Sequence, residues 1–121
     1  QAVQNLHFQP GLDVKDPVET GLEVQILDSL GKPDDKLTHH DNGGVIRTAA
    51  PSKNASKPAG EWNKMTIRAK GKQLQVELNG QQVIDVDLDQ TDSKNKPLTG
   101  AISLQDHGLP LWFRNIRIRK L

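Results

Sequence analysis

Cysteine and tyrosine are both absent from the 121-residue sequence. Without cysteine the chain has no disulfide framework, no Cys-ligated zinc, no iron–sulfur cluster and no thiol nucleophile. Aromatic residues make up only 3% of the chain, so its core must consist mainly of valine, isoleucine and leucine. Apolar runs are also short, and we therefore expect neither a membrane span nor an intact signal peptide in this chain.

Neither sign of charge dominates, because the sequence has 16 lysines and arginines and 15 aspartates and glutamates. Proteins that bind nucleic acids or acidic membrane surfaces usually have a marked excess of basic residues. The sequence therefore predicts no nucleic-acid partner. Its length fits one ordinary hydrophobic core, and we expect residues 1–121 to form a single domain.

Long apolar stripes at helical spacing are missing, whereas alternation with a period of two runs through most of the chain. The alternation is clearest from Lys72 to Leu88, where Asn79-Gly80 separates two alternating segments. Asn-Gly supplies the two positive-φ residues that a type I′ turn requires. We therefore predict a hairpin here, preceded by a strand from Met65 to Lys70.

Three further segments alternate in the same way and are predicted as strands: residues 22–26, 101–105 and 111–121. Polar stretches with Pro or Gly, residues 31–42, 51–60 and 89–97, are predicted as loops. Short strands without covering helices bury their apolar faces by stacking two sheets. The fold class predicted is all-β, an antiparallel β-sandwich.

Five motifs occur in one order along the chain: Thr20–Asp28 (TGLEVQILD), Gly60–Asn63 (GEWN), Leu78–Gly80 (LNG), Leu104–Gly108 (LQDHG) and Trp112–Ile118 (WFRNIRI). Together they resemble the 3-keto-disaccharide hydrolase domain family. The resemblance implies a concanavalin A-like jelly roll whose concave sheet carries a carbohydrate-binding cleft. It also implies cleavage of 3-oxo glycosides by periplasmic or secreted bacterial proteins.

Family domains have further strands before the Glu-Val-Gln strand, whereas only residues 1–19 precede it here. The resemblance therefore predicts a partial or trimmed jelly roll, corresponding to the C-terminal portion of the family domain. The missing strands could come from an upstream segment or from another protein chain, or the sandwich could be smaller. An open sheet edge would favour association.

Glu23 and Gln25 share one side of the predicted 22–26 strand, opposite Leu22 and Val24. A carboxylate beside an amide suits the hydroxyl groups of a sugar. The resemblance implies that Glu23 is a catalytic acid or base, with Gln25 and Asp28 in contact with substrate. The alternative is a solvated outer strand face.

His107 lies in the short link between the last two predicted strands, and histidine transfers protons near neutral pH. The resemblance implies that His107 is the second catalytic residue, with Gln105 and Asp106 binding substrate beside it. The alternative is that Asp106 and His107 only cap the turn through hydrogen bonds to the backbone.

His40 and Arg114 complete the predicted substrate-binding set. Arg114 is in phase with Ile116 and Ile118, which favours a structural, ion-paired role unless a bulge directs it at substrate. The run His39-His40-Asp41 is a weak metal motif, because adjacent side chains diverge. We expect no metal and no cofactor.

Two functions remain open from the sequence. In the first, a base removes the C2 proton that a 3-oxo group acidifies, and elimination is followed by hydration, so one good base suffices. In the second, the domain is a non-catalytic module for carbohydrate binding or assembly. With so few aromatics, Trp62 and Trp112 are expected to fill the core rather than stack on a sugar.

Overall fold

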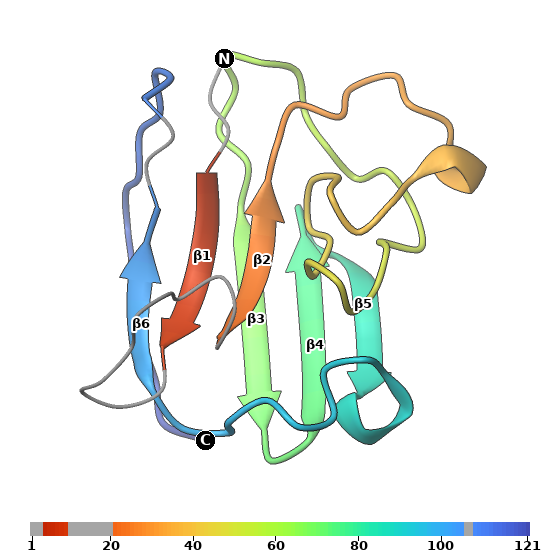
Figure 1. Cartoon of the computed structure of the whole chain (residues 1–121). Helices are drawn as coiled ribbons and strands as arrows, with labels where there is room; N and C mark the ends of the chain where they lie inside the picture. Colours follow the sequence, from red (N-terminus) through yellow and green to blue (C-terminus); the bar gives the residue numbers. More distant parts are fainter. Residues whose placement is uncertain (1–3, 10–20, 106–107) are drawn as a thin grey trace.

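Six strands form two three-stranded antiparallel sheets in the computed structural model of the chain (Figure 1). The structure describes residues 4–9, 21–105 and 108–121, and for residues 4–9 the backbone alone. The first sheet has the order β2-β1-β6 and consists of β1 (Gln4–Gln9), β2 (Leu22–Ile26) and β6 (Ala101–Leu104). The second has the order β3-β4-β5 and consists of β3 (Met65–Lys70), β4 (Gln73–Leu78) and β5 (Gln81–Asp87).

Helical structure in the described residues is limited to two 3-10 turns, η1 (Asp34–Lys36) and η2 (Leu88–Gln90), which lie in predicted loops or at their start. The predicted fold class, an all-β antiparallel sandwich of jelly-roll type, is therefore confirmed. None of the described residues belongs to a helix long and apolar enough to cross a membrane.

The predicted hairpin is present as β4 and β5, and its turn has the positive φ angles expected, 53° at Asn79 and 82° at Gly80. One feature interrupts the predicted alternation. The register shifts between Val76, which pairs with Ile84, and Glu77, which pairs with Gln82. This β-bulge lets two consecutive residues of β5, Val83 and Ile84, both be buried.

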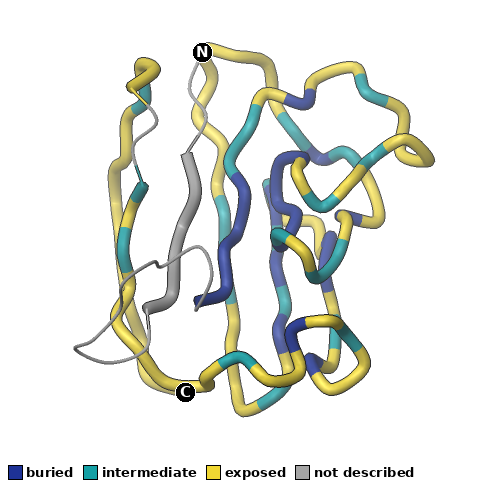
Figure 2. Tube along the Cα trace, in the orientation of Figure 1, coloured by how far each residue is buried: buried dark blue, intermediate teal, exposed yellow. Residues whose placement is uncertain are grey.

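The hydrophobic core lies between β2 and the β4–β5 hairpin. Val24, Val45 and Val76 are fully buried and belong to one cluster with the apolar residues of the hairpin. Figure 2 shows the buried stretches on β2, β4 and β5, whereas β6 and the C-terminal segment are mainly exposed. The core is therefore displaced toward one side of the sandwich.

The predicted strand at residues 111–121 is wrong, because residues 108–121 form no regular secondary structure. Asn115 has a φ of 54°, in the left-handed region, and this conformation breaks the alternation of an extended strand. The expectation that both tryptophans fill the core is also wrong. Trp62 is 44% exposed and Trp112 is 72% exposed, because neither lies on a strand of the sandwich.

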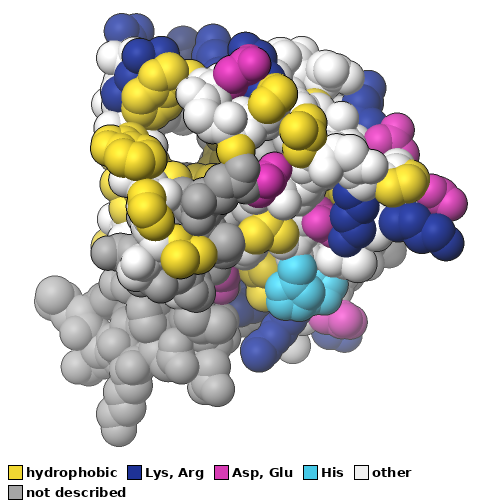
Figure 3. All heavy atoms as spheres, turned by 90° about the horizontal axis from the view of Figure 1, so that it is seen from above, with side chains coloured by type: hydrophobic (Ala, Val, Ile, Leu, Met, Phe, Trp, Pro, Cys, Tyr) yellow, Lys and Arg dark blue, Asp and Glu magenta, His cyan; other side chains and the backbone are white. Residues whose placement is uncertain are grey.

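Hydrophobic side chains gather on the side of the molecule that carries β6, at the left of Figure 3. On β6 itself Ile102 and Leu104 are both exposed. The C-terminal segment adds further exposed apolar side chains, namely Leu109, Trp112, Phe113, Ile116, Ile118 and Leu121. We call these eight residues the β6-side apolar surface.

Candidate functional site

Glu23 and Gln25 lie on β2 and are both buried, with exposed fractions of 5% and 6%. On the neighbouring strand β1, the backbone register pairs Glu23 with His7 and Gln25 with Asn5. Leu22 and Val24 occupy the other side of β2 and join the core. The alternative of a solvated outer face is therefore wrong for these two polar residues.

The other edge of β2 is covered by the segment from Gly43 to Ile46. The backbone N–H of Gln25 donates to the Gly44 carbonyl at 2.8 Å, and the N–H of Ile46 donates to the Glu23 carbonyl at 2.9 Å. A Cβ atom at Gly44 would lie 2.7 Å from the backbone oxygen of His39, so only glycine fits here. The segment therefore lies directly beside the Glu23–Gln25 strand.

A tight turn follows this segment and presents Arg47. Two backbone hydrogen bonds between Val45 and Ala49, of 2.9 and 3.0 Å, close the turn, and Arg47 at its tip has a φ of 58°. The N–H of Arg47 donates to Nδ1 of His39 at 3.0 Å. His40 lies beside His39, with 4.1 Å between their ring centroids. The predicted residue His40 is thus held next to the turn that borders β2.

His39 is neutral over a wider pH range than a free histidine. Its pKa is lowered by burial, and further by the positive charges of His40 and Arg47. A neutral Nδ1 is what the hydrogen bond from Arg47 requires, because a protonated imidazole has no acceptor.

Lys96 reaches the same end of β2 from the loop that follows η2. Its Nζ donates to the Gly21 carbonyl at 2.6 Å, two residues before Glu23. The hydroxyl groups of Thr48 and Ser93 share a short hydrogen bond, which ties this loop to the Arg47 turn. Burial and the charge of Arg47 lower the pKa of Lys96, whereas the charge of Glu23 acts in the opposite direction.

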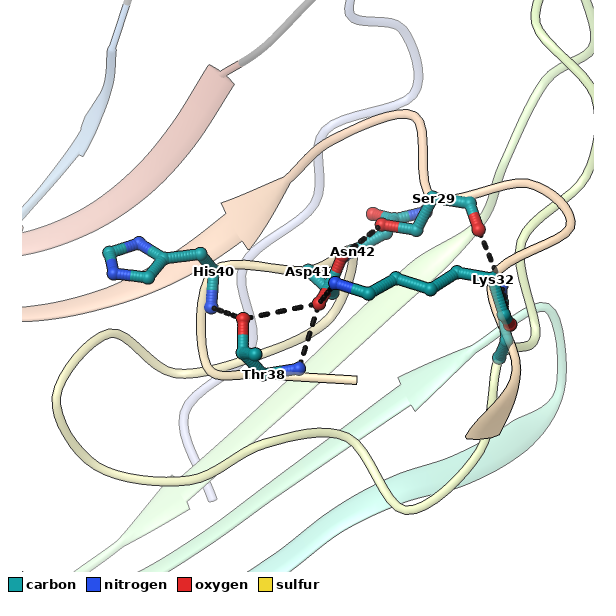
Figure 4. Close-up of polar contacts among 7 residues, drawn as sticks. Ser29, Lys32, Thr38, His40, Asp41 and Asn42 are labelled. Carbon is teal, nitrogen blue, oxygen red and sulfur yellow. Dashed lines mark hydrogen bonds and ion pairs between the residues drawn. The ribbon is translucent and has the colours of Figure 1, made fainter. Parts of the chain in front are cut away.

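Asp41 organises the loop that carries the two histidines (Figure 4). Its Oδ2 accepts from Lys32 Nζ at 2.6 Å and from the Thr38 N–H at 2.7 Å, while its Oδ1 accepts from Ser29 Oγ at 3.0 Å. Burial alone would raise the pKa of Asp41, but these hydrogen bonds outweigh it and lower the pKa. In Figure 4 the imidazole of His40 points away from this network.

The predicted residues at the end of β6 are only partly described. The register aligns Ser103 of β6 with His7 of β1, and His7 in turn with Glu23, so the three positions form one row across the sheet. Gln105 follows β6 and is partly buried. Asp106 and His107 lie outside the described residues, and their place beside Glu23 stays a prediction.

Two predicted substrate-binding residues, Asp28 and Arg114, have local contacts in the described structure, and their role in binding stays a prediction. The Asp28 carboxylate is exposed and accepts a hydrogen bond from the Leu30 N–H at 3.2 Å, as in a simple turn. The guanidinium of Arg114 lies 3.9 Å from the ring centroid of Trp62, a cation–π contact at the surface. Neither contact involves the residues around Glu23.

The structure adds Arg47 and Lys96 to the residues predicted from the sequence. Both are basic residues in polar loops, a pattern that carries no signal of a site. Within residues 21–105 and 108–121 no three His, Asp or Glu side chains are grouped so that they could hold a metal ion. The described site consists of a buried carboxylate and amide, two neighbouring cations and a histidine pair.

The fold and the site together define a class of protein. It is an antiparallel β-sandwich with a buried carboxylate and a buried amide side by side on one strand. The model of the 3-keto-alpha-glucoside-1,2-lyase-like domain family matches residues 5–119, and the chain belongs to this family. A 3-keto-disaccharide hydrolase of Bacteroides thetaiotaomicron is 33% identical over an alignment of 140 positions. The alignment covers 92% of this chain and 48% of that protein, so the chain spans about half the length of this curated relative.

A solved structure has the same fold. It is a crystal structure from Parabacteroides distasonis, of a protein provisionally assigned as a glycosyl hydrolase. The TM-score is 0.66 and the sequence identity 23%, over 88% of this chain and 69% of the other. At this identity the likeness supports the fold alone.

Proposed function

We propose that this domain acts on carbohydrates and cleaves 3-oxo glycosides by elimination, with Glu23 as the base. The observation that carries the proposal is the burial of the Glu23 carboxylate beside the Gln25 amide, on a covered strand of a domain of this family. Burying a charged side chain is unfavourable unless polar groups beside it offset the loss of water. A carboxylate can take a proton from carbon, and an amide beside it can form hydrogen bonds with the hydroxyl groups of a sugar.

The elimination requires one proton transfer at carbon, and the later hydration returns a proton to C2. Glu23 takes the proton from C2 of the sugar, and the electrons of the C–H bond form an enolate with the C3 oxygen. The enolate then expels the glycosidic oxygen from C1, which leaves as an alcohol after protonation, and the carbonyl at C3 is restored. His107 is the proposed donor of that proton, and hydration of the unsaturated product completes the cleavage.

Gln25, His40 and Gln105 are the proposed binding partners of the sugar hydroxyls. Arg114 and Asp28 have the local contacts described above, and we propose no role for them in the chemical step. By analogy with the family, we further propose that the protein works in the periplasm or outside the cell.

The test is Glu23→Gln in the complete polypeptide, assayed with 3-oxo glycosides. The variant keeps the shape of the side chain and removes the base, so kcat should fall by roughly 10²–10⁴-fold while substrate binding is retained. Glu61→Gln is the matched control, because Glu61 is an exposed loop residue, and it should keep the wild-type rate. Wild-type turnover by Glu23→Gln would remove Glu23 from the mechanism.

One observation favours a second function. The β6-side apolar surface is what a module for assembly with another chain would present. If the unmodified protein turns over none of several 3-oxo glycosides, this alternative replaces the enzymatic one.

A further inference from the structure

Two cationic residues, Arg47 and Lys96, lie near Glu23 at one end of β2, and the proposed base accounts for neither of them. Arg47 comes from the turn after the segment that pairs with β2. Lys96 comes from a loop 49 positions further along the chain, counted from residue 47 to residue 96. The fold therefore brings both to one end of β2 from separate loops.

The Arg47 turn is fixed to Glu23 through the backbone. The N–H of Ile46 donates to the Glu23 carbonyl at 2.9 Å, and Arg47 is the next residue. Its positive φ of 58° is uncommon for a residue with a side chain, and the two hydrogen bonds between Val45 and Ala49 hold it. A left-handed conformation at a non-glycine residue often marks a position where side-chain placement matters.

The Lys96 loop is fixed to the same place by two contacts. Lys96 Nζ lies 2.6 Å from the Gly21 carbonyl, and Ser93, which is only 1% exposed, shares a hydrogen bond with Thr48 in the Arg47 turn. Burial and the charge of Arg47 lower the pKa of Lys96, whereas the charge of Glu23 raises it. These three charged groups sum to one positive charge.

Arg47 is exposed and Lys96 is half-buried, and two cations near one carboxylate attract a group on which negative charge develops. In the proposed reaction negative charge develops on the C3 oxygen of the sugar when Glu23 removes the C2 proton. We propose that Arg47 and Lys96 bind this oxygen and stabilise the enolate. The inference rests on the proposed function and names the groups that would supply its electrostatic stabilisation.

The atoms balance within the step already described. The C2–H bond breaks and its proton goes to the Glu23 carboxylate, while its electron pair forms the C2–C3 double bond and places the charge on the C3 oxygen. Arg47 and Lys96 gain or lose no proton. They only stabilise the charge on the C3 oxygen, which passes to the departing glycosidic oxygen when the C1–O bond breaks and the neutral C3 carbonyl re-forms.

The experiment compares Lys96→Met and Arg47→Asn with the charge-preserving variants Lys96→Arg and Arg47→Lys, in the complete polypeptide. Asn is chosen at position 47 because it tolerates a positive φ. Lys94→Met is the matched control, since Lys94 is exposed and lies in the same loop as Lys96. Thermal unfolding of every variant checks that the fold is kept.

Two readouts are measured, turnover of a 3-oxo glycoside and loss of deuterium from its C2 position by NMR. The charge-removing variants should lose about 100-fold or more in both rates, with little change in KM, because the charge develops only after binding. The charge-preserving variants should recover at least part of the loss, and Lys94→Met should match wild type.

Wild-type exchange and turnover in both charge-removing variants would overturn this inference and leave Glu23 as the base. Equal losses in the charge-preserving variants would also overturn it, because a purely structural role would then account for the effect. Absence of exchange and turnover in the unmodified protein would instead contradict the proposed function itself.

Discussion

Asp41 shows how one residue can fix a long loop beside the site. It accepts hydrogen bonds from Ser29, Lys32 and Thr38, which span the whole loop between β2 and the histidine pair. Asn54 extends the network, because its amide donates to the Ser29 carbonyl and the Lys32 carbonyl. The position of His40 therefore depends on a carboxylate that has no role in the proposed chemistry.

Asp41→Asn should lower the free energy of unfolding by about 2 kcal/mol near neutral pH, because hydrogen bonds to a charged group are lost. The pKa of Asp41 is lowered from its ordinary value of 3.8 by folding, so its contribution is present above that pH and is lost as the pH falls through the folded value. Urea unfolding from pH 7 to pH 3 should show the variant and wild type converging. Asp35→Asn, an exposed change in η1, should stay within about 0.5 kcal/mol of wild type.

His39 should titrate below its ordinary pKa of 6.5, because burial and two neighbouring positive charges disfavour its protonated form. Its contribution to stability is then present above pH 6.5 and is lost as the pH falls through the folded pKa. An NMR titration of the imidazole signals measures this directly. A midpoint at or above 6.5 would contradict the hydrogen bond from Arg47 to Nδ1.

At the scale of elements, the β4–β5 hairpin is the best test of the face assignment. Val76 is fully buried at the middle of β4, so Val76→Asp should place an unpaired charge in the core and unfold the domain. Circular dichroism and a thermal melt would detect the loss. Lys70→Asp, an exposed change on β3, is the control and should leave the domain folded. A folded Val76→Asp protein would mean that β4 presents its other face to the core.

The hairpin and β2 could be predicted from the sequence because local chemistry defines them. Asn79-Gly80 fits only one common turn, and alternation assigns the two faces of each strand. The bulge at Val83 and the left-handed Asn115 could not be predicted, because both depend on packing beyond the local pattern. For the same reason the predicted strand at 111–121 is wrong.

The carboxylate and the amide of the candidate site could be predicted from the sequence, whereas its two cationic residues could not. Glu23 and Gln25 share a strand with a readable alternation, so their common side follows from sequence. Arg47 and Lys96 come together only through tertiary contacts between separate loops. No spacing along the chain encodes such contacts, and the burial that distinguishes Glu23 from a surface residue is likewise a tertiary property.

At the scale of the whole molecule, the hydrophobic core occupies one side of the sandwich, whereas apolar side chains are exposed on the other side. The core joins β2 to the β4–β5 hairpin, whereas β6 exposes Ile102 and Leu104. Exposed apolar surface next to an edge strand favours association.

We therefore expect the isolated 121-residue chain to associate in solution. Light scattering should detect oligomers or aggregates at micromolar concentration, and the double variant Ile102→Lys and Ile118→Lys should shift the chain toward monomer. The control is Leu30→Lys, because Leu30 is an exposed apolar residue outside this surface. This variant should not shift the chain toward monomer. A sharply monomeric wild-type chain would show that the apolar surface is covered in solution.

The contact between Thr48 and Ser93 bears on the order in which the molecule folds. The two residues are 45 positions apart, and Lys96 lies 75 positions from Gly21, whereas β4 and β5 are joined by two residues. Closing a long loop costs more conformational entropy than closing a short one, so the hairpin should form early and the loops around Glu23 late. A chain stalled during folding would thus possess its hairpin and lack the contacts around Glu23, and a mutation that weakens the Thr48–Ser93 contact would slow the formation of those contacts more than the formation of β-structure.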